Sequence, residues 1–121
     1  MTVQQIFNSL PIVNKLTELK LPIKKAYEIY SLVKKLEEQR VFFAQEEQKM
    51  VSKFNAQIME NGNIRFNTAE DQKGFTQEHA ELMQFEIAEI AAVELKFSDL
   101  GDEPFSPKEI MMLEGVVNFV E

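Results

Sequence analysis

His79 is the single histidine in a chain of 121 residues that has no cysteine. A histidine that works in catalysis or metal binding needs an orienting carboxylate and further ligands. Its acidic neighbours Glu78 and Glu81 are one and two positions away, and residues at those spacings do not face each other on a helix. We therefore expect His79 to be a solvated surface residue. The absence of cysteine excludes disulfides, thiolate zinc sites and cysteine nucleophiles, and it is typical of a reducing compartment.

Pairs of nearby acidic residues are the other candidates for chemistry. They are Glu37 with Glu38, Glu46 with Glu47, Glu86 with Glu89, and Asp102 with Glu103. Two carboxylates perform acid–base catalysis when they converge in a dry cleft, whereas these pairs fall on predicted solvated helix faces or in a loop. The loops 60–63 and 99–103 lack the alternating oxygen ligands and terminal glutamate of an EF-hand. The sequence therefore predicts no catalytic residue, no metal site and no cofactor, and we expect the chain not to be an enzyme.

The net charge of −7 at pH 7 is unevenly distributed along the chain. Residues 1–36 carry six lysines against two glutamates, a local net charge of +4, so the remainder is strongly acidic. Nucleic-acid phosphates and anionic lipid repel such a chain, which argues against direct nucleic-acid or membrane binding. Two interpretations stay open: oppositely charged faces of an ordinary soluble protein, or an acidic surface that mimics nucleic acid or meets a basic partner.

Length and hydropathy indicate a soluble, cytoplasmic protein. No stretch approaches the ~20 apolar residues that a membrane-spanning helix needs. The first five residues form neither the basic region nor the apolar run of a signal peptide. The length suits a single domain over residues 1–121, and 45% hydrophobic residues with ten phenylalanines are sufficient for a core.

Local signals predict two short helices followed by one long helix. Thr2 and Gln5 form a capping box, while Pro11 is tolerated at a helix start and not in a helix interior. The pattern predicts a break near residue 10 and a second short helix to about residue 19. Pro22 then favours a new helix start, and neither glycine nor proline follows until after Asn55. Apolar residues recur there at intervals near three, four and seven, which predicts a helix roughly 50 Å long.

A β-hairpin is predicted over residues 58–67. Asn61 and Gly62 suit a two-residue turn in which both residues adopt positive φ. Ile64 and Phe66 alternate with polar residues, so we expect both to face the body of the protein. Thr68 is the expected cap of a returning helix of about 15 residues.

The C-terminal third mixes strand and helix signals. Alternation at residues 93–97 predicts a strand, whereas residues 86–91 suit either state and we favour an extended one. Residues 106–109 start a helix with a serine cap, a proline at the first position and a capping box. We expect this helix to continue to Val120, weakened by Gly115. The predicted fold class is mainly α with a small antiparallel β part, in which the N-terminal helices and the last helix pack at the open end of the long hairpin.

Aromatic residues on the predicted long helix allow two interpretations. One apolar stripe along this helix comprises Ala26, Tyr27, Tyr30 and Val33. A stripe of this kind most often packs in the core of a protein. Phe42 and Phe43 lie about 100° apart around a helix, so they are either core residues or exposed anchors for a partner. A returning helix of about 15 residues covers less than half of the long helix and leaves Phe42, Phe43 and Met50 least accounted for. We hypothesise that these three residues contact another chain, either a second copy or the biological target.

Several short segments carry a resemblance to a known family. They are Leu21–Tyr27, the turn at 60–63, Glu86-Ile87, residues 95–100, residues 105–109, and Leu113-Glu114. On these segments the chain resembles a family of short, functionally uncharacterised proteins encoded by phages and prophages of Gram-positive bacteria, although the ending at 116–120 departs from the family pattern. The resemblance implies a phage context and the host bacterial cytoplasm, and it carries no active residues over.

Three classes of function follow from these observations. The first is a non-enzymatic accessory protein that binds a host or defence protein complex, which fits the small size, the acidity and the lack of catalytic motifs. The second is a virion assembly chaperone or minor structural component, for which a long exposed helix is equally suited. The third is an enzyme without recognisable motifs. We favour the first, with a protein as the partner and homo-oligomerisation left open.

Overall fold

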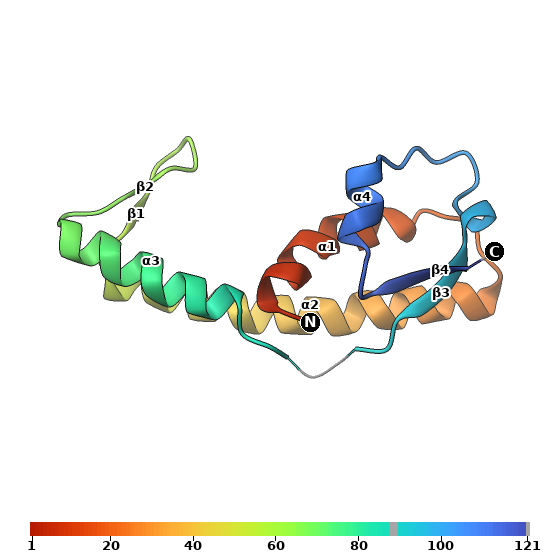
Figure 1. The fold of residues 1–121 in the computed structure, drawn as a ribbon, viewed down its shortest axis with the longest axis horizontal. Coiled ribbons are helices and arrows are strands. Elements are labelled where there is room, and N and C mark those ends of the chain that lie inside the picture. Colours follow the sequence, from red (N-terminus) through yellow and green to blue (C-terminus); the bar gives the residue numbers. More distant parts are fainter. Residues whose placement is uncertain (88–89, 121) are drawn as a thin grey trace.

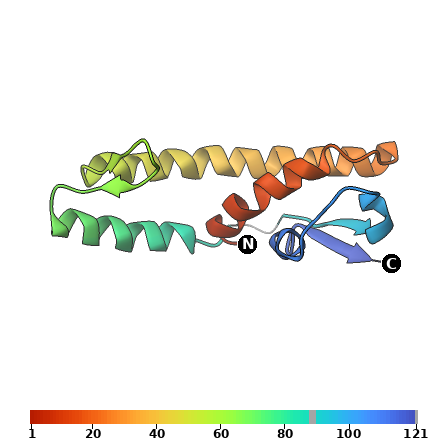
Figure 2. The same cartoon turned by 90° about the horizontal axis from the view of Figure 1, so that it is seen from above.

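The computed structural model describes residues 1–87 and 90–120 (Figure 1). Its elements are α1 (Val3–Leu16), α2 (Ile23–Lys53), β1 (Gln57–Ile58), β2 (Ile64–Arg65), α3 (Ala69–Met83), β3 (Val93–Lys96), the 3₁₀ helix η1 (Phe97–Leu100), α4 (Pro107–Met112) and β4 (Val117–Val120). The fold is mainly α with a minor β part, as the sequence predicts. Helix α2 runs the length of the molecule, and the other helices and the β3–β4 pair lie on one side of it (Figure 2).

The long helix α2 begins and ends where local signals place it. It starts directly after Pro22, and its 31 residues span about 46 Å at ~1.5 Å per residue. Asn55 follows its end with a φ of 54°. The N–H of Ala56 donates to the carbonyl of Val51 at 2.9 Å, and the N–H of Asn55 donates to Ser52 at 3.3 Å. These two bonds form a Schellman motif, with asparagine in the left-handed position that glycine usually takes.

The N-terminal segment forms one helix, so the predicted break before Pro11 is wrong. Helix α1 continues through Pro11, which lies exposed inside it. A proline in a helix interior costs about 3 kcal/mol. The opposite face buries Ile6, Leu10, Val13 and Leu16. Each buried aliphatic side chain contributes about 1.5–3 kcal/mol, so packing of this face outweighs the lost hydrogen bond.

The hairpin forms, but its turn differs from the predicted one. Ile58 pairs with Ile64, which leaves the five-residue loop 59–63 in place of two residues. Gly62 has a φ of 85°, whereas Asn61 does not adopt positive φ; the Asn61 Oδ1 instead accepts from the N–H of Asn63 at 3.0 Å. Ile64 is 43% exposed, so its predicted inward orientation is wrong. Phe66, which follows the two-residue strand β2, is half-buried, and its ring centre lies 5.3 Å from that of Phe75, so its predicted inward orientation is confirmed.

The end of the chain is a strand, so the predicted helix to Val120 is also wrong. Helix α4 ends at Met112, and Gly115 has a φ of 91°, which an α-helix does not allow. Strand β4 then runs parallel to β3, with Val93 opposite Val117. The inward side chains of this parallel pair are buried in the core. The segment between the strands provides the long crossover that a parallel pair requires.

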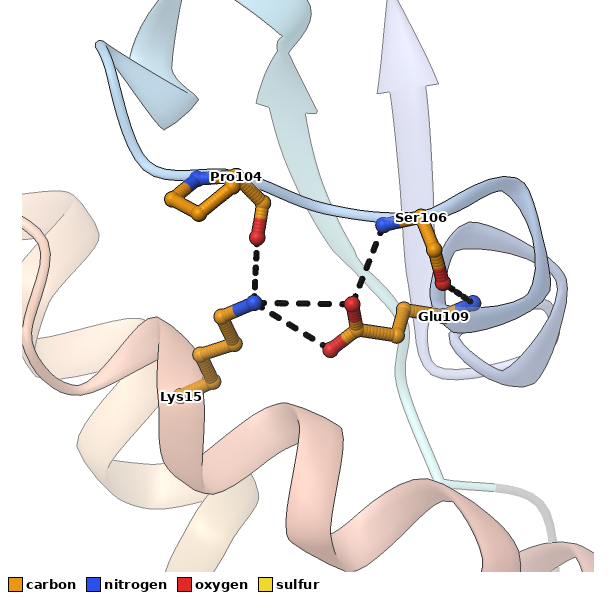
Figure 3. A network of polar contacts seen from close by, with 4 residues as sticks. All are labelled: Lys15, Pro104, Ser106 and Glu109. Atoms are coloured by element: carbon orange, nitrogen blue, oxygen red, sulfur yellow. Dashed lines mark hydrogen bonds and ion pairs between the residues drawn. The ribbon is translucent and has the colours of Figure 1, made fainter.

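Lys15 attaches α4 to α1 (Figure 3). Its Nζ donates to the Pro104 carbonyl and lies 3.2 Å from Glu109 Oε2 and 4.4 Å from the Phe105 ring centre. The predicted capping box holds the same glutamate: the N–H of Ser106 donates to Glu109 Oε1 at 3.0 Å, and the Ser106 Oγ accepts from the Glu109 N–H at 3.1 Å. The Ser106 N–H, followed by Lys15, lowers the pKa of Glu109. One carboxylate therefore both caps α4 and fixes its position.

Buried side chains divide the molecule into a body and an arm. The body comprises residues 1–36 and 90–120, and the arm comprises residues 37–87. The body core contains Ile6, Leu10, Val13, Leu16, Ile29, Leu32, Leu36, Val93, Leu95, Leu100, Leu113, Val116 and Val117. A second cluster, at the junction with the arm, contains Val3, Phe43 and Met83. The expected packing of the N-terminal and last helices at the open end of the hairpin is confirmed.

Candidate functional site

A groove of about 480 Å³ lies between α2 and α3 at the start of the arm. Its lining residues are Phe42, Phe43, Glu46, Met50, Glu78, Glu81, Leu82 and Phe85. The three residues that the sequence singles out for partner contact are all among them. Positions 42, 46 and 50 are four residues apart, so α2 presents them along one edge of the groove.

The three predicted contact residues differ in exposure. Phe42 is 55% exposed, Met50 is half-buried, and Phe43 is only 6% exposed. Phe43 packs in the cluster with Val3 and Met83. The core interpretation therefore holds for Phe43, and the exposed interpretation holds for Phe42.

Phe43 forms the floor between two exposed aromatic walls. Its ring centre lies 5.0 Å from that of Phe42 in an edge-on arrangement and 5.9 Å from that of Phe85. Such pairs contribute about 0.5–1.5 kcal/mol beyond burial. Because Phe43 is fixed by the core, it also orients Phe42 and Phe85, which are 55% and 56% exposed. The groove thus exposes two aromatic rings on a rigid base.

Phe85 is held at the groove by the N-terminal segment. The N–H of Val3 donates to the Phe85 carbonyl at 3.1 Å, and the N–H of Ile87 donates to the Met1 carbonyl at 2.9 Å. The extended state favoured for residues 86–91 is confirmed at residues 86–87. Ala88 and Glu89, and with Glu89 one member of the Glu86/Glu89 pair, lie outside the described residues. Phe85 is not among the predicted site residues, because its placement depends on pairing with a segment more than 80 residues away.

The rim of the groove is acidic. Three of the eight lining residues are glutamates and none is a lysine or arginine. Lys49 approaches Glu46 at 2.9 Å and Lys53 approaches Glu78 at 2.7 Å, so two of these carboxylates have a cation beside them. The arm as a whole has ten acidic and five basic residues, whereas the described body has eight of each. The excess negative charge of the described chain is therefore concentrated on the arm.

His79 contacts both helices of the arm and is half-buried, not fully solvated as expected. Its Nε2 lies 3.0 Å from Glu47 Oε2 on α2, and its ring stacks on Phe75 at 5.3 Å. The side chain is 34% exposed. Its sequence neighbours Glu78 and Glu81 do not face it, whereas its carboxylate partner Glu47 comes from α2.

The remaining acidic pairs do not converge on one another. Glu37 accepts from Arg40 at 2.8 Å, and this hydrogen bond and the charge of Glu37 raise the pKa of Arg40. Glu46 contacts Lys49, and Glu47 contacts His79. Within residues 1–87 and 90–120, no group of three or more His, Asp or Glu side chains is arranged to hold a metal ion.

Comparison with protein-family models, with curated proteins and with solved structures found no significant match to this chain. None of the helices described here is long and apolar enough to cross a membrane.

Proposed function

We propose that the chain is a non-enzymatic accessory protein, encoded by a phage, that docks onto a host or defence protein complex through the arm groove. The observation that supports this most is the exposure of Phe42 and Phe85 on either side of the buried Phe43. Exposed aromatic residues clustered on a rigid base are typical of binding hot spots. The phage context rests on the resemblance described above.

The chemistry of the groove specifies the kind of partner. An apolar side chain inserted between Phe42 and Phe85 removes both rings from water. The three rim glutamates favour lysine or arginine beside that side chain, because complementary charges steer association and orient the partner. A basic amphipathic helix has both features, since it presents an apolar stripe flanked by cations.

A defined peptide tests this chemistry. An 18-residue amphipathic peptide of leucine and lysine with one tryptophan gives a clean fluorescence signal, because the chain itself has no tryptophan. We expect the peptide to bind, and its glutamate counterpart to bind at least about tenfold more weakly. Phe42→Ser should weaken binding of the lysine peptide by about tenfold, as expected for a hot-spot residue.

The matched control is Ile58→Ser, which removes a 61% exposed apolar side chain from the hairpin. Circular dichroism of both variants checks that the fold is retained. Equal affinities of Phe42→Ser and Ile58→Ser for the lysine peptide contradict the groove proposal. Affinity capture from infected cells then uses the original protein, Phe42→Ser and Ile58→Ser as baits. It identifies the partners whose retention depends on Phe42.

A virion assembly chaperone or minor structural component is the second candidate. It is favoured by the uncovered long side of α2, which suits repeated contacts in an assembly (Figure 2). Mass spectrometry of purified virions distinguishes the two: an accessory protein is absent from them, a structural component is retained, and an assembly chaperone occurs in assembly intermediates alone.

A further inference from the structure

The side of α2 that faces away from the other helices carries large apolar residues in water. They are Ile23 (85% exposed), Tyr27 (66%), Tyr30 (58%) and Val41 (45%). The rings of Tyr27 and Tyr30 lie 6.0 Å apart and form one aromatic patch. The sequence favours a core position for these tyrosines, and their exposure contradicts it. Tyr27 and Tyr30 therefore present a water-exposed aromatic pair on this side of α2.

These residues belong to a regular second seam of α2. The seam positions are Ile23, Tyr27, Tyr30, Lys34, Glu37, Val41, Ala44 and Gln48. Intervals that alternate between four and three residues keep a seam aligned with a partner helix. The buried seam of α2, at Ile29, Leu36 and Phe43, lies on the opposite side of the helix. Helix α2 thus has two seams, and the monomer covers one of them.

The centre of the outer seam is charged and concave. A shallow depression of about 540 Å³ is lined by Tyr30, Val33, Lys34, Glu37, Glu38 and Val41. Lys34 lies toward the N-terminal side of its centre, and Glu37 lies toward the C-terminal side. Glu37 also accepts from Arg40 of its own helix at 2.8 Å. The patch therefore presents one charge of each sign, Lys34 before its centre and Glu37 after it.

We propose that the outer seam binds a second copy of the chain, with the two α2 helices antiparallel and the twofold axis between Lys35 and Leu36. This register pairs Lys34 with Glu37, Tyr30 with Val41, Tyr27 with Ala44, and Ile23 with Gln48 of the other copy. Both central layers then join opposite charges, and each apolar layer places a tyrosine against a smaller aliphatic residue. A twofold interface of this kind is self-complementary and closed.

The charges select the orientation. In a parallel pair, Lys34 would face Lys34 and Glu37 would face Glu37, and juxtaposed like charges are unfavourable. The antiparallel pair replaces both repulsions with attractions. Phe42 lies about 100° around the helix from the outer seam at Val41, so the pairing leaves the arm groove open. The proposal is therefore independent of the function proposed for that groove.

Charge reversal tests the register in the full-length protein. Analytical ultracentrifugation should show particles of twice the 14.0 kDa chain mass at micromolar concentration. Lys34→Glu and Glu37→Lys should each raise the dimer Kd by about tenfold or more, because each places like charges in both central layers. The double variant restores the pairs and should return the Kd to near that of the original protein.

Lys35→Glu is the matched control, because it makes the same charge change at an exposed position outside the seam. It should leave the dimer Kd unchanged, and circular dichroism verifies that every variant is helical. A chain that stays monomeric to about millimolar concentration overturns the proposal. So does a dimer that the Lys34 and Glu37 variants leave intact.

A distance measurement decides the orientation directly. The chain has no cysteine, so Ile23→Cys provides one unique position for a nitroxide label. At ~1.5 Å per residue, the antiparallel register separates the two labels by roughly 38 Å. A parallel pair brings them to roughly 10 Å, the usual distance between packed helix axes. A short distance in the dimer refutes the antiparallel arrangement.

Discussion

In the body, α2 packs against α1 and β3, whereas in the arm it packs mainly against α3. The body buries thirteen core residues drawn from α1, α2, β3, β4 and the segments around α4. The arm is held to it by a cluster of three and continues outward through aromatic contacts such as Phe66 with Phe75 at 5.3 Å. The same helix is therefore enclosed at one end and supported on one side at the other. Regions with few buried apolar contacts open at lower free energy, so we expect the arm to open more readily than the body.

The largest expected effect separates the two cores. Leu36→Ala removes a side chain with 0% exposure from the body and should lower the free energy of unfolding by about 2–5 kcal/mol. Phe43→Ala should instead loosen the arm, because its ring joins Val3 and Met83 at the junction. Hydrogen exchange should show faster exchange throughout for the first variant and mainly in α3 for the second. If Phe43→Ala accelerates hydrogen exchange equally in β3 and α3, the arm does not open separately from the body.

A smaller effect, with an informative sign, is expected at Gly74 in α3. Alanine in a helix interior is normally favoured over glycine by about 1 kcal/mol. A Cβ at Gly74, however, would lie 2.5 Å from Cε1 of Phe54, whose ring packs edge-on against Phe75. We expect Gly74→Ala to be net destabilising by about 1 kcal/mol, because overpacking displaces this ring. Urea denaturation measures the change; exposed Thr76→Ala is the control, and a stabilised Gly74→Ala would show that the Phe54 ring moves freely.

The smallest expected effect concerns the attachment of α4 in the body. The pKa of Glu109 is lowered by the Ser106 N–H and then by Lys15. The folded state therefore favours the ionised carboxylate, and this contribution is present above the ordinary pKa of about 4.5 and is lost as the pH falls through the folded-state value. At neutral pH, Glu109→Gln should melt at a lower temperature than the original protein. Thermal unfolding should show that this difference in melting temperature shrinks as the pH falls below about 4.5. The control is Glu103→Gln, which makes the same charge change in the preceding loop.

The candidate site was accessible from the sequence only in part. Phe42 and Met50 could be predicted as contact residues, because local patterns show that the returning helix is too short to cover the long one. Phe85 and Leu82 complete the groove only because α3 returns along α2 and because Thr2, the cap of α1, forms a β-bridge with Glu86. Those contacts join segments far apart in the chain, and no local pattern encodes them.

The sequence by itself determined the elements whose boundaries depend on neighbouring residues. The cap at Thr68 and the capping box at residues 106–109 are hydrogen bonds between a side chain and a nearby backbone group. The start of α2 after Pro22 and its end before Asn55 follow from the backbone conformations that these two residues favour. Only the tertiary structure decided the elements whose local preference is weak or unfavourable. Helix α1 continues through Pro11 because burial of its other face against the body outweighs the cost. Residues 117–120 form β4 because β3 offers a strand to pair with, a partner that residues 117–120 do not specify.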